Sequence, residues 1–209
     1  MDSQILIQAL LWACVALSGD GNWLLQADAL APILRLRDAR QDVLRDIPLR
    51  RLDGTGTSKV RAVYNLSTRK SFIVVLSDLP ELWEISYNPQ AEPIYNGLVH
   101  DYKMGESLGT PGYLGVRRTL LDQPLQTLWF DASQRYVVSV ERASPEGAAR
   151  ARVVNLDVRR EIARLAIANW PADDAPLQLS LGSHTLQVRA LALDTREEAK
   201  RLQQRYCTP

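Results

Sequence analysis

Apolar runs alternate with short polar turns along most of the chain. Three segments share one arrangement, in which an apolar run, a turn rich in Asp, Ser, Gly or Asn, and a second apolar run follow one another: residues 12–25, 60–76 and 128–140. β-branched and aromatic residues on both sides of a tight turn are typical of a β-hairpin. Further β-rich segments follow at residues 82–87 and 151–157. The pattern therefore predicts a chain built mainly of short strands.

The three hairpin segments recur at a roughly regular distance. They start about 50 and then about 65 residues apart, and the longer interval contains an insertion. Repetition at roughly 40–50 residues, with about four short strands in each unit, indicates a β-propeller or a related array. A four-stranded blade buries its faces only against neighbouring blades. We predict a mainly β fold in which residues 1–170 form an incomplete propeller-like array of about three blades.

Residues 171–209 change in character and form a predicted C-terminal tail. The segment 177–193 alternates between apolar and polar residues on both sides of a Gly-Ser-His turn, which predicts a β-hairpin. Asp194 and Glu197 have the spacing of a capping box, so a short α-helix is expected up to about Tyr206. A hairpin and a short helix are too little to fold alone. We expect the tail to pack on the preceding sheet.

Charge and cysteine content exclude several classes of protein. The 25 Lys and Arg nearly balance the 24 Asp and Glu, which gives no electrostatic case for nucleic-acid binding. Cys14 and Cys207 could form one disulfide, but two cysteines exclude a disulfide-rich scaffold or a zinc cluster. With only two His and two Met, few ligands remain for a metal. No metal site is predicted.

The N-terminal apolar run, Ile5 to Leu17, allows two interpretations. It resembles the hydrophobic part of a signal peptide, but Asp2 stands where such a peptide has positive charge, and no clear cleavage site follows. The run is also too short to span a bilayer. We expect a folded strand here, with a signal or an anchor as the alternative.

Residues 91–124 form the longest irregular stretch in the predicted array. Turn-forming Gly and Pro residues recur along it, and long loops inside compact domains are usually functional or disordered. Its aromatic content favours order. The stretch contains the polar and aromatic residues His100, Asp101, Tyr102, Lys103, Glu106, Tyr113, Arg117 and Arg118.

Two adjoining sequences carry a resemblance to a known family. "SFIVVLSDLPELWEISYNP" (residues 71–89) and "EPIYNGLVHDYKMGE" (residues 92–106) resemble the cytochrome d1-type propeller proteins. The likeness is to the haem d1 biosynthesis branch, relatives of the d1 domain of cytochrome cd1 nitrite reductase, and it extends over residues 12–167. It implies a role in haem d1 biosynthesis or d1-dependent nitrite reduction, with a tetrapyrrole, haem d1, bound over the propeller axis. It also implies a periplasmic location, with the cytoplasm as the alternative because no convincing signal peptide is present.

The resemblance places the loop that contains His100 near the cofactor. His100 is then the candidate catalytic acid or propionate contact, and the arginines and lysine are candidates for binding the acidic side chains of haem d1. Aromatic residues could stack on the macrocycle. The candidate cofactor-binding residues are His100, Tyr102, Lys103, Tyr113, Arg117 and Arg118.

Each candidate also has a purely structural interpretation. His100 could bond Asp101 or the backbone, and the arginine pair could form a solvated strand edge that discourages sheet pairing. His184 is expected as an exposed turn residue. Aromatic residues in β arrays are more often part of the core or of blade interfaces than ligand contacts. Those weighed for stacking are Trp83, Tyr87, Tyr95, Tyr102 and Tyr113.

The chain also departs from the family pattern. A propeller of eight blades, at about 40–45 residues per blade, needs on the order of 350 residues. The blades that would carry the proximal haem ligand have no counterpart, and "NWPADDAP" (residues 169–176) lacks the expected His. An incomplete ring exposes apolar blade faces, so we expect a homo-oligomer, a partner chain that supplies the missing blades, or closure by the tail. The alternative function is a non-enzymatic interaction or scaffold module that has lost the cofactor site, and whether the chain is an enzyme stays open.

Overall fold

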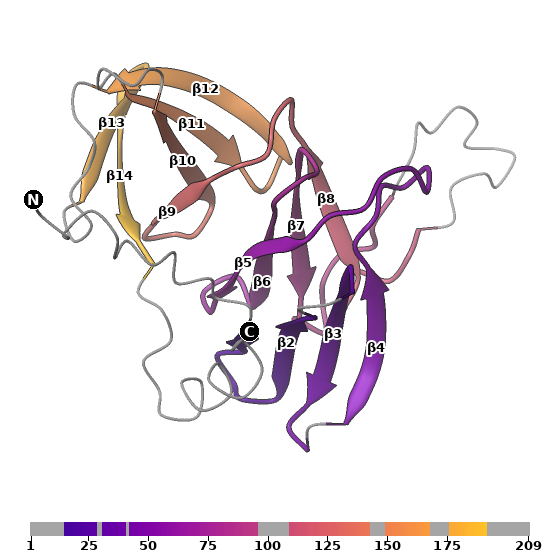
Figure 1. Ribbon diagram of the computed structural model, residues 1–209. Helices are drawn as coiled ribbons and strands as arrows, with labels where there is room; N and C mark the ends of the chain where they lie inside the picture. The colour runs from indigo at the N-terminus through magenta and orange to yellow at the C-terminus, as the bar shows by residue number, and fades with distance from the viewer. Residues whose placement is uncertain are drawn as a thin grey trace, which may run out of the picture.

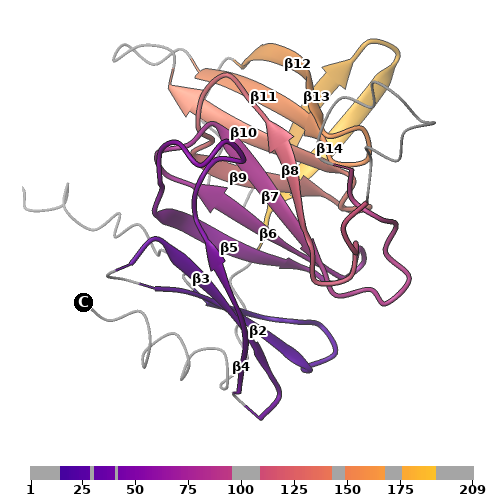
Figure 2. The same ribbon diagram turned by 90° about the vertical axis from the view of Figure 1, so that its right-hand side faces the viewer.

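The structure is a computed structural model that describes residues 15–28, 31–40, 42–95, 109–142, 149–167 and 176–191. Fourteen strands in these residues form three antiparallel sheets, which stack as successive layers from the N-terminal to the C-terminal part of the chain (Figure 1, Figure 2). No helix occurs in the described ranges, and so none there could cross a membrane. The predicted C-terminal helix and both cysteines lie outside the described residues.

The first and second sheets are simple meanders in which each strand pairs with the next. The first sheet has the order β1-β2-β3-β4 and the second β5-β6-β7-β8. Their strands are β1 (Val15–Leu17), β2 (Trp23–Ala27), β3 (Ile33–Asp38), β4 (Val43–Pro48), β5 (Val60–Leu66), β6 (Ser71–Leu76), β7 (Glu81–Ser86) and β8 (Val116–Leu120).

The third sheet contains a four-stranded meander and the C-terminal hairpin. Its order is β12-β11-β10-β9-β14-β13, so the hairpin extends the sheet beyond the first strand of the blade. Its strands are β9 (Thr127–Asp131), β10 (Tyr136–Arg142), β11 (Ala149–Asn155), β12 (Arg160–Ile167), β13 (Leu177–Leu181) and β14 (His184–Ala190). The predicted mainly β fold, with three propeller-like blades and a C-terminal hairpin, is confirmed.

Three strands were not predicted from the sequence. β3 and β4 carry Arg and Asp residues between their apolar ones, and β8 lies inside the stretch predicted to be irregular. Strands at the outer side of a blade are half solvated, so their sequences lack the dense apolar runs of buried strands. The unpredicted strands complete the first and second blades.

The middle blade packs against both of its neighbours, and β6 shows this most directly. Phe72 and Val74 face the first sheet and belong to one apolar core, whereas Ile73 and Val75 face the third sheet and belong to another. All four side chains have no exposed surface. Because successive side chains of a strand point to opposite faces, a strand buried on both faces has an unbroken apolar sequence.

Tyr64 on β5 belongs to the contact between the second and third sheets. Its ring lies 5.1 Å from that of Phe130, and burial raises the pKa of the Tyr64 phenol from 10.0 to about 12. The neutral phenol is therefore favoured in the fold, and this contribution to stability is complete below pH 10 and is lost as the pH rises towards 12. We expect a spectrophotometric titration to show one tyrosine ionising near pH 12 and Tyr64→Phe to lack that phase. A late phase of equal size in Tyr64→Phe would contradict the assignment.

The far face of the third sheet has its own apolar core, to which the C-terminal hairpin contributes. Leu179 of β13 and Val188 of β14 join Trp129, Val138 and Val153 of the meander. β14 is anchored to β9 by the register Val188↔Asp131 to Ala190↔Trp129. The predicted hairpin is thus a continuous part of the third sheet.

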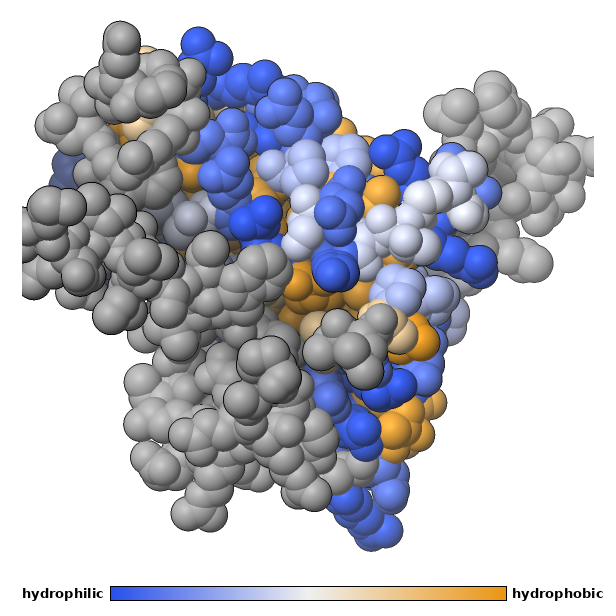
Figure 3. Space-filling model, in the orientation of Figure 1, coloured by the Kyte–Doolittle hydropathy of each residue, from blue (hydrophilic) through white to orange (hydrophobic). Residues whose placement is uncertain are grey.

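The outward face of the first sheet is polar on its β3 and β4 side. Arg35 forms ion pairs with Asp28 (2.6 Å) and Asp46 (3.3 Å), and the Arg37 Nε donates to Gln26 Oε1. This differs from the expectation that both terminal faces are apolar, because exposed charges oppose association with another sheet. Large apolar side chains are exposed on this blade where β4 begins, at Val43 (48%) and Leu44 (51%). Figure 3 shows hydrophobic and hydrophilic surface side by side at the lower right of the molecule.

Candidate functional site

One end of the array gathers turns from all three sheets together with the connection in which sequence reasoning placed most of its candidate residues. In an antiparallel meander the first and third turns lie at the same end of the sheet. In this chain these are the turns after β1, β5 and β9 and the connections after β3, β7 and β11. We call this the turn end.

The turn after β1 is organised by its own side chains. Asp20 Oδ1 accepts hydrogen bonds from the Ser18 hydroxyl (2.5 Å) and the Asn22 amide (3.1 Å), and Ser18 Oγ accepts one from the Trp23 amide. Burial acts to raise the pKa of Asp20, but the hydrogen bonds from Ser18 and Asn22 outweigh it and hold the pKa below its usual value. Asp20 is therefore an ionised structural group and not a proton donor at neutral pH.

Tyr87 joins this turn to the second sheet. Its hydroxyl accepts a hydrogen bond from the Gly19 amide (3.2 Å) and donates one to Asn65 Oδ1 (2.8 Å). A Cβ on Gly19 would lie 3.1 Å from the Cβ of Ser67, so the turns of the first two blades are in close contact. This contact sets the position of Trp23, which directly follows the turn.

A pocket of about 480 Å³ opens between these two turns. Trp23, Tyr87 and Tyr113 supply an aromatic wall, and Lys70 is the cation among the lining residues. The rings of Trp23 and Tyr113 meet edge to face, with centroids 6.1 Å apart. A volume of this size falls within the range of about 300–1,000 Å³ that binds small organic molecules. The remaining lining residues are Gly19, Asp20, Asn22, Ser67 and Pro89.

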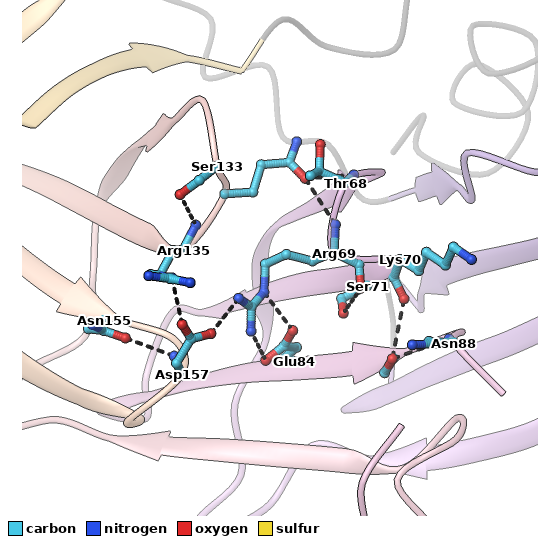
Figure 4. Close-up of polar contacts among 12 residues, drawn as sticks. Thr68, Arg69, Lys70, Ser71, Glu84, Asn88, Ser133, Arg135, Asn155 and Asp157 are labelled. Carbon is cyan, nitrogen blue, oxygen red and sulfur yellow. Dashed lines mark hydrogen bonds and ion pairs between the residues drawn. The ribbon is translucent and has the colours of Figure 1, made fainter. Parts of the chain in front are cut away.

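The contact between the second and third blades at the turn end is closed by a charge network (Figure 4). The Arg69 guanidinium bonds Glu84 (3.1 Å) and Asp157 (2.7 Å), and Asp157 also pairs with Arg135. Burial acts to lower the pKa of Arg69, but Glu84 and Asp157 more than offset this and raise it. Gln134 adds a neutral link, because its Oε1 accepts from the Thr68 amide. The network joins the two blades, and its charges are already paired.

Of the residues predicted from the sequence, Tyr113 lies in the pocket. His100, Tyr102 and Lys103 lie outside the described residues, but both ends of their segment are described. Ile94 and Thr110 are joined by two backbone hydrogen bonds of 2.8 and 2.9 Å.

Arg117 and Arg118 do not converge on a common ligand. They are successive residues of β8, so their side chains point to opposite faces of the second sheet. Arg118 is largely buried towards the first sheet, where its guanidinium donates to Glu81 Oε2 and lies 4.2 Å from the Trp83 ring centroid. Arg117 donates to the Glu92 carbonyl on the other side. Their proposed part in cofactor binding stays a prediction, but they cannot clamp one carboxylate together.

The other aromatic candidates are distributed differently. Trp83 has no exposed surface and donates its indole N–H to Glu81 Oε2, so it is a core residue. Tyr95 is half exposed and lies with Arg117 in a separate hollow that also borders the third blade. Of the five aromatics considered for stacking, Tyr87 and Tyr113 are the described ones that reach the pocket.

Sequence reasoning missed two lining residues, Trp23 and Lys70. Trp23 directly follows a predicted turn, and Lys70, the last residue of another predicted turn, has a positive φ of 51°. The signal available for Trp23 was a large aromatic residue immediately after the tight turn of residues 18–22. Residues beside a turn lie at the end of a blade, and loops at the ends of a rigid scaffold commonly carry ligand sites.

The lining residues of the pocket suit contact with the periphery of a planar macrocycle better than coordination of the metal at its centre. Aromatic side chains and a lysine suit stacking and carboxylate binding. No His, Cys or Met is among its lining residues, and no group of three or more potential metal ligands occurs in the part of the chain that the structure describes. His184 is exposed at the start of β14, as expected for a turn residue.

No family model matches the chain. A dihydro-haem d1 dehydrogenase of Pseudomonas aeruginosa is 28% identical over 158 residues, which is 75% of this chain and 27% of the relative. The structure of the dihydro-haem d1 dehydrogenase NirN in complex with DHE superposes with a TM-score of 0.57 and 27% identity over 79% of this chain and 30% of that one. The chain thus spans less than a third of the length of each of these two proteins.

Three stacked four-stranded meanders, each burying its faces against the next, define part of a β-propeller. The chain is related to the cytochrome d1-type β-propeller family, as its likeness to the dihydro-haem d1 dehydrogenases in both sequence and fold supports.

Proposed function

We propose that this chain is a tetrapyrrole-binding component of haem d1 metabolism. The observation that carries the proposal is the aromatic pocket at the turn end in a chain related to a dihydro-haem d1 dehydrogenase. Trp23 and Tyr113 would hold the edge of the macrocycle, and Lys70 would pair with one of its carboxylates. When bound, haem d1 would supply the redox chemistry.

Three blades form only part of a ring, so a macrocycle on this pocket would keep an open side. We propose that further blades complete the site, either from a second copy of the chain or from a partner chain. His100, Tyr102 and Lys103 would contribute from the connection after β7, with His100 as the acid. A periplasmic location is proposed from the family relationship.

The direct test is titration of the chain with haem d1, or with haem b as a surrogate, followed by the Soret band. We expect saturable binding that Tyr113→Ala weakens about three- to tenfold, because an aromatic contact contributes roughly 0.5–1.5 kcal/mol. Tyr95→Ala is the matched control, since Tyr95 lies outside the pocket and should leave binding unchanged.

The two histidines provide a second pair of variants. We expect His100→Ala to shift the Soret band and His184→Ala, on the exposed start of β14, to leave it unchanged. Absence of any Soret change with the unmodified chain would reject tetrapyrrole binding by this chain alone. A change that neither Tyr113→Ala nor His100→Ala affects would reject this site.

A specific observation also favours the second candidate, an interaction or scaffold module without a cofactor. β9, the first strand of the third blade, is paired with β14. In a propeller the first strands of the blades line the central channel. A hairpin on that edge would occupy space in which a family member holds its ligand. Binding of a protein partner with no Soret response would support this candidate.

A further inference from the structure

A second hollow runs along the outer rim of the array, between β4 of the first sheet and β8 of the second. It has a volume of about 500 Å³. We call it the rim groove. Its lining residues are Arg45, Ile47, Pro48, Arg50, Arg51 and Leu52 from one side and Thr110, Pro111, Tyr113, Gly115, Val116 and Arg118 from the other.

The rim groove has an apolar component. Ile47 is 3% exposed and belongs to the core between the first two sheets, and Val116 packs against the same core. Leu52, at one end, is 58% exposed. β4 and β8 are the outer strands of their sheets, so each has an edge whose backbone groups pair with no other described strand. An occupant that runs along the strands would meet apolar side chains and free backbone groups.

The charged side chains that line the rim groove are all positive. Four arginines line it, and no carboxylate residue does. Arg118 is compensated by buried Glu81, but the ion pairs found among the described residues include none with Arg45, Arg50 or Arg51.

The compensations found for Arg45 and Arg51 are weak. Arg45 donates to the Leu114 carbonyl at 3.1 Å, which is a neutral acceptor. Arg51 attracts exposed Asp53, whose pKa is lowered mainly by hydrogen bonds from Thr55. The whole chain carries 25 basic and 24 acidic residues, so this cluster does not reflect a general excess of positive charge. Guanidinium groups bind carboxylates with two parallel hydrogen bonds, which makes carboxylate the complementary group.

We propose that the rim groove binds an extended acidic segment of a partner protein. Its carboxylates would pair with Arg45, Arg50 and Arg51, and small apolar side chains between them would contact Ile47 and Leu52. An extended peptide places alternate side chains on opposite sides, which suits a groove with charged walls and an apolar floor. The groove is separate from the aromatic pocket, except that Tyr113 borders both.

The probe is a short fluorescein-labelled peptide in which glutamate alternates with valine, and binding is followed by fluorescence anisotropy. We expect binding that weakens as salt is added, because exposed charges are screened. The double variant R45Q/R51Q should weaken binding about tenfold, which corresponds to the loss of two exposed charge pairs. Arg160→Gln is the matched control, because Arg160 is an exposed arginine of β12 on the third blade and should change nothing.

Three results would overturn the proposal. The first is equal binding of a peptide with glutamine in place of glutamate. The second is wild-type affinity in both R45Q/R51Q and the charge-reversed variant Arg51→Glu. The third is full displacement of the peptide by citrate at the same carboxylate concentration, which would make the groove a site for small anions. The affected side chains are exposed, and unchanged thermal unfolding of each variant checks that the fold is kept.

Discussion

Val188→Asp is expected to detach the C-terminal hairpin from the third sheet and to lower the free energy of unfolding by about 4 kcal/mol. Val188 has no exposed surface, pairs with Leu177 on β13 and Asp131 on β9, and lies in the core on the far face of the sheet. A carboxylate at this position would be buried without a partner. For a chain of this size the loss corresponds to a fall in Tm of roughly 10 °C.

The matched control is Gln187→Asp, one residue earlier. Gln187 is exposed on the opposite face of β14, so the same new charge should change Tm by little. If the hairpin covers the far face, Val188→Asp should also expose the apolar core and produce higher oligomers in light scattering. Equal Tm values and equal masses for the two variants would show that the hairpin contributes nothing to the fold.

Arg152→Met is expected to destabilise the chain by about 3–5 kcal/mol at neutral pH, because it leaves several carboxylates around a buried position without their cation. Arg152 is 3% exposed and bonds Asp122 (2.7 Å), Glu141 (3.0 Å) and Glu161 (2.8 Å). Burial acts to lower the pKa of Arg152, but hydrogen bonds with Glu161 and Glu141 outweigh it and raise the pKa. Arg164 contacts Asp122 and Glu161 from the solvent side, but its side chain is 53% exposed, so it does not supply the buried cation that Arg152 supplies.

The defect of Arg152→Met should depend on pH in a defined direction. In the wild type, a hydrogen bond from Arg164 lowers the pKa of Asp122, with support from the charge of Arg152 and against the effect of burial. The ionised Asp122 therefore stabilises the fold above about pH 4, and this stabilisation is lost as the pH falls through the folded pKa. In the variant Asp122 lacks the support of Arg152, and this loss no longer matters once the Asp122 carboxyl is protonated. The stability difference between the two proteins should therefore shrink from pH 7 to pH 4.

Arg150→Met provides the control for the Arg152 variant. Arg150 is exposed on the same strand, β11, and should cost less than about 0.5 kcal/mol. Chemical denaturation at several pH values measures both variants. A stability difference for Arg152→Met that is constant between pH 7 and pH 4 would show that lost packing, and not the three carboxylates, causes the defect.

The sequence placed some residues of the site correctly and others wrongly, and the difference depends on the strand structure around each residue. Tyr113 was predicted as a binding residue and lines the pocket. Arg117 and Arg118 were treated as a pair, but both lie within β8, and the alternation of a strand sends them to opposite faces. The family resemblance directed attention to the connection after β7. It could not indicate that the turn after β1 would meet Tyr87, which is 68 residues away from Gly19 in sequence.

The sequence alone determined most of the hairpins and the class of fold, although it did not reveal β3, β4 and β8. Tight turns between apolar runs specify hairpins, and unbroken apolar runs such as residues 72–76 specify strands buried on both faces, because these signals depend on neighbouring residues. Only the tertiary structure decided where the C-terminal hairpin pairs, which charges meet around Arg152 and Arg69, and which side chains share a pocket. Those contacts join residues far apart in the chain, and they depend on how the faces of the sheets pack, for which a single sequence carries no local signal.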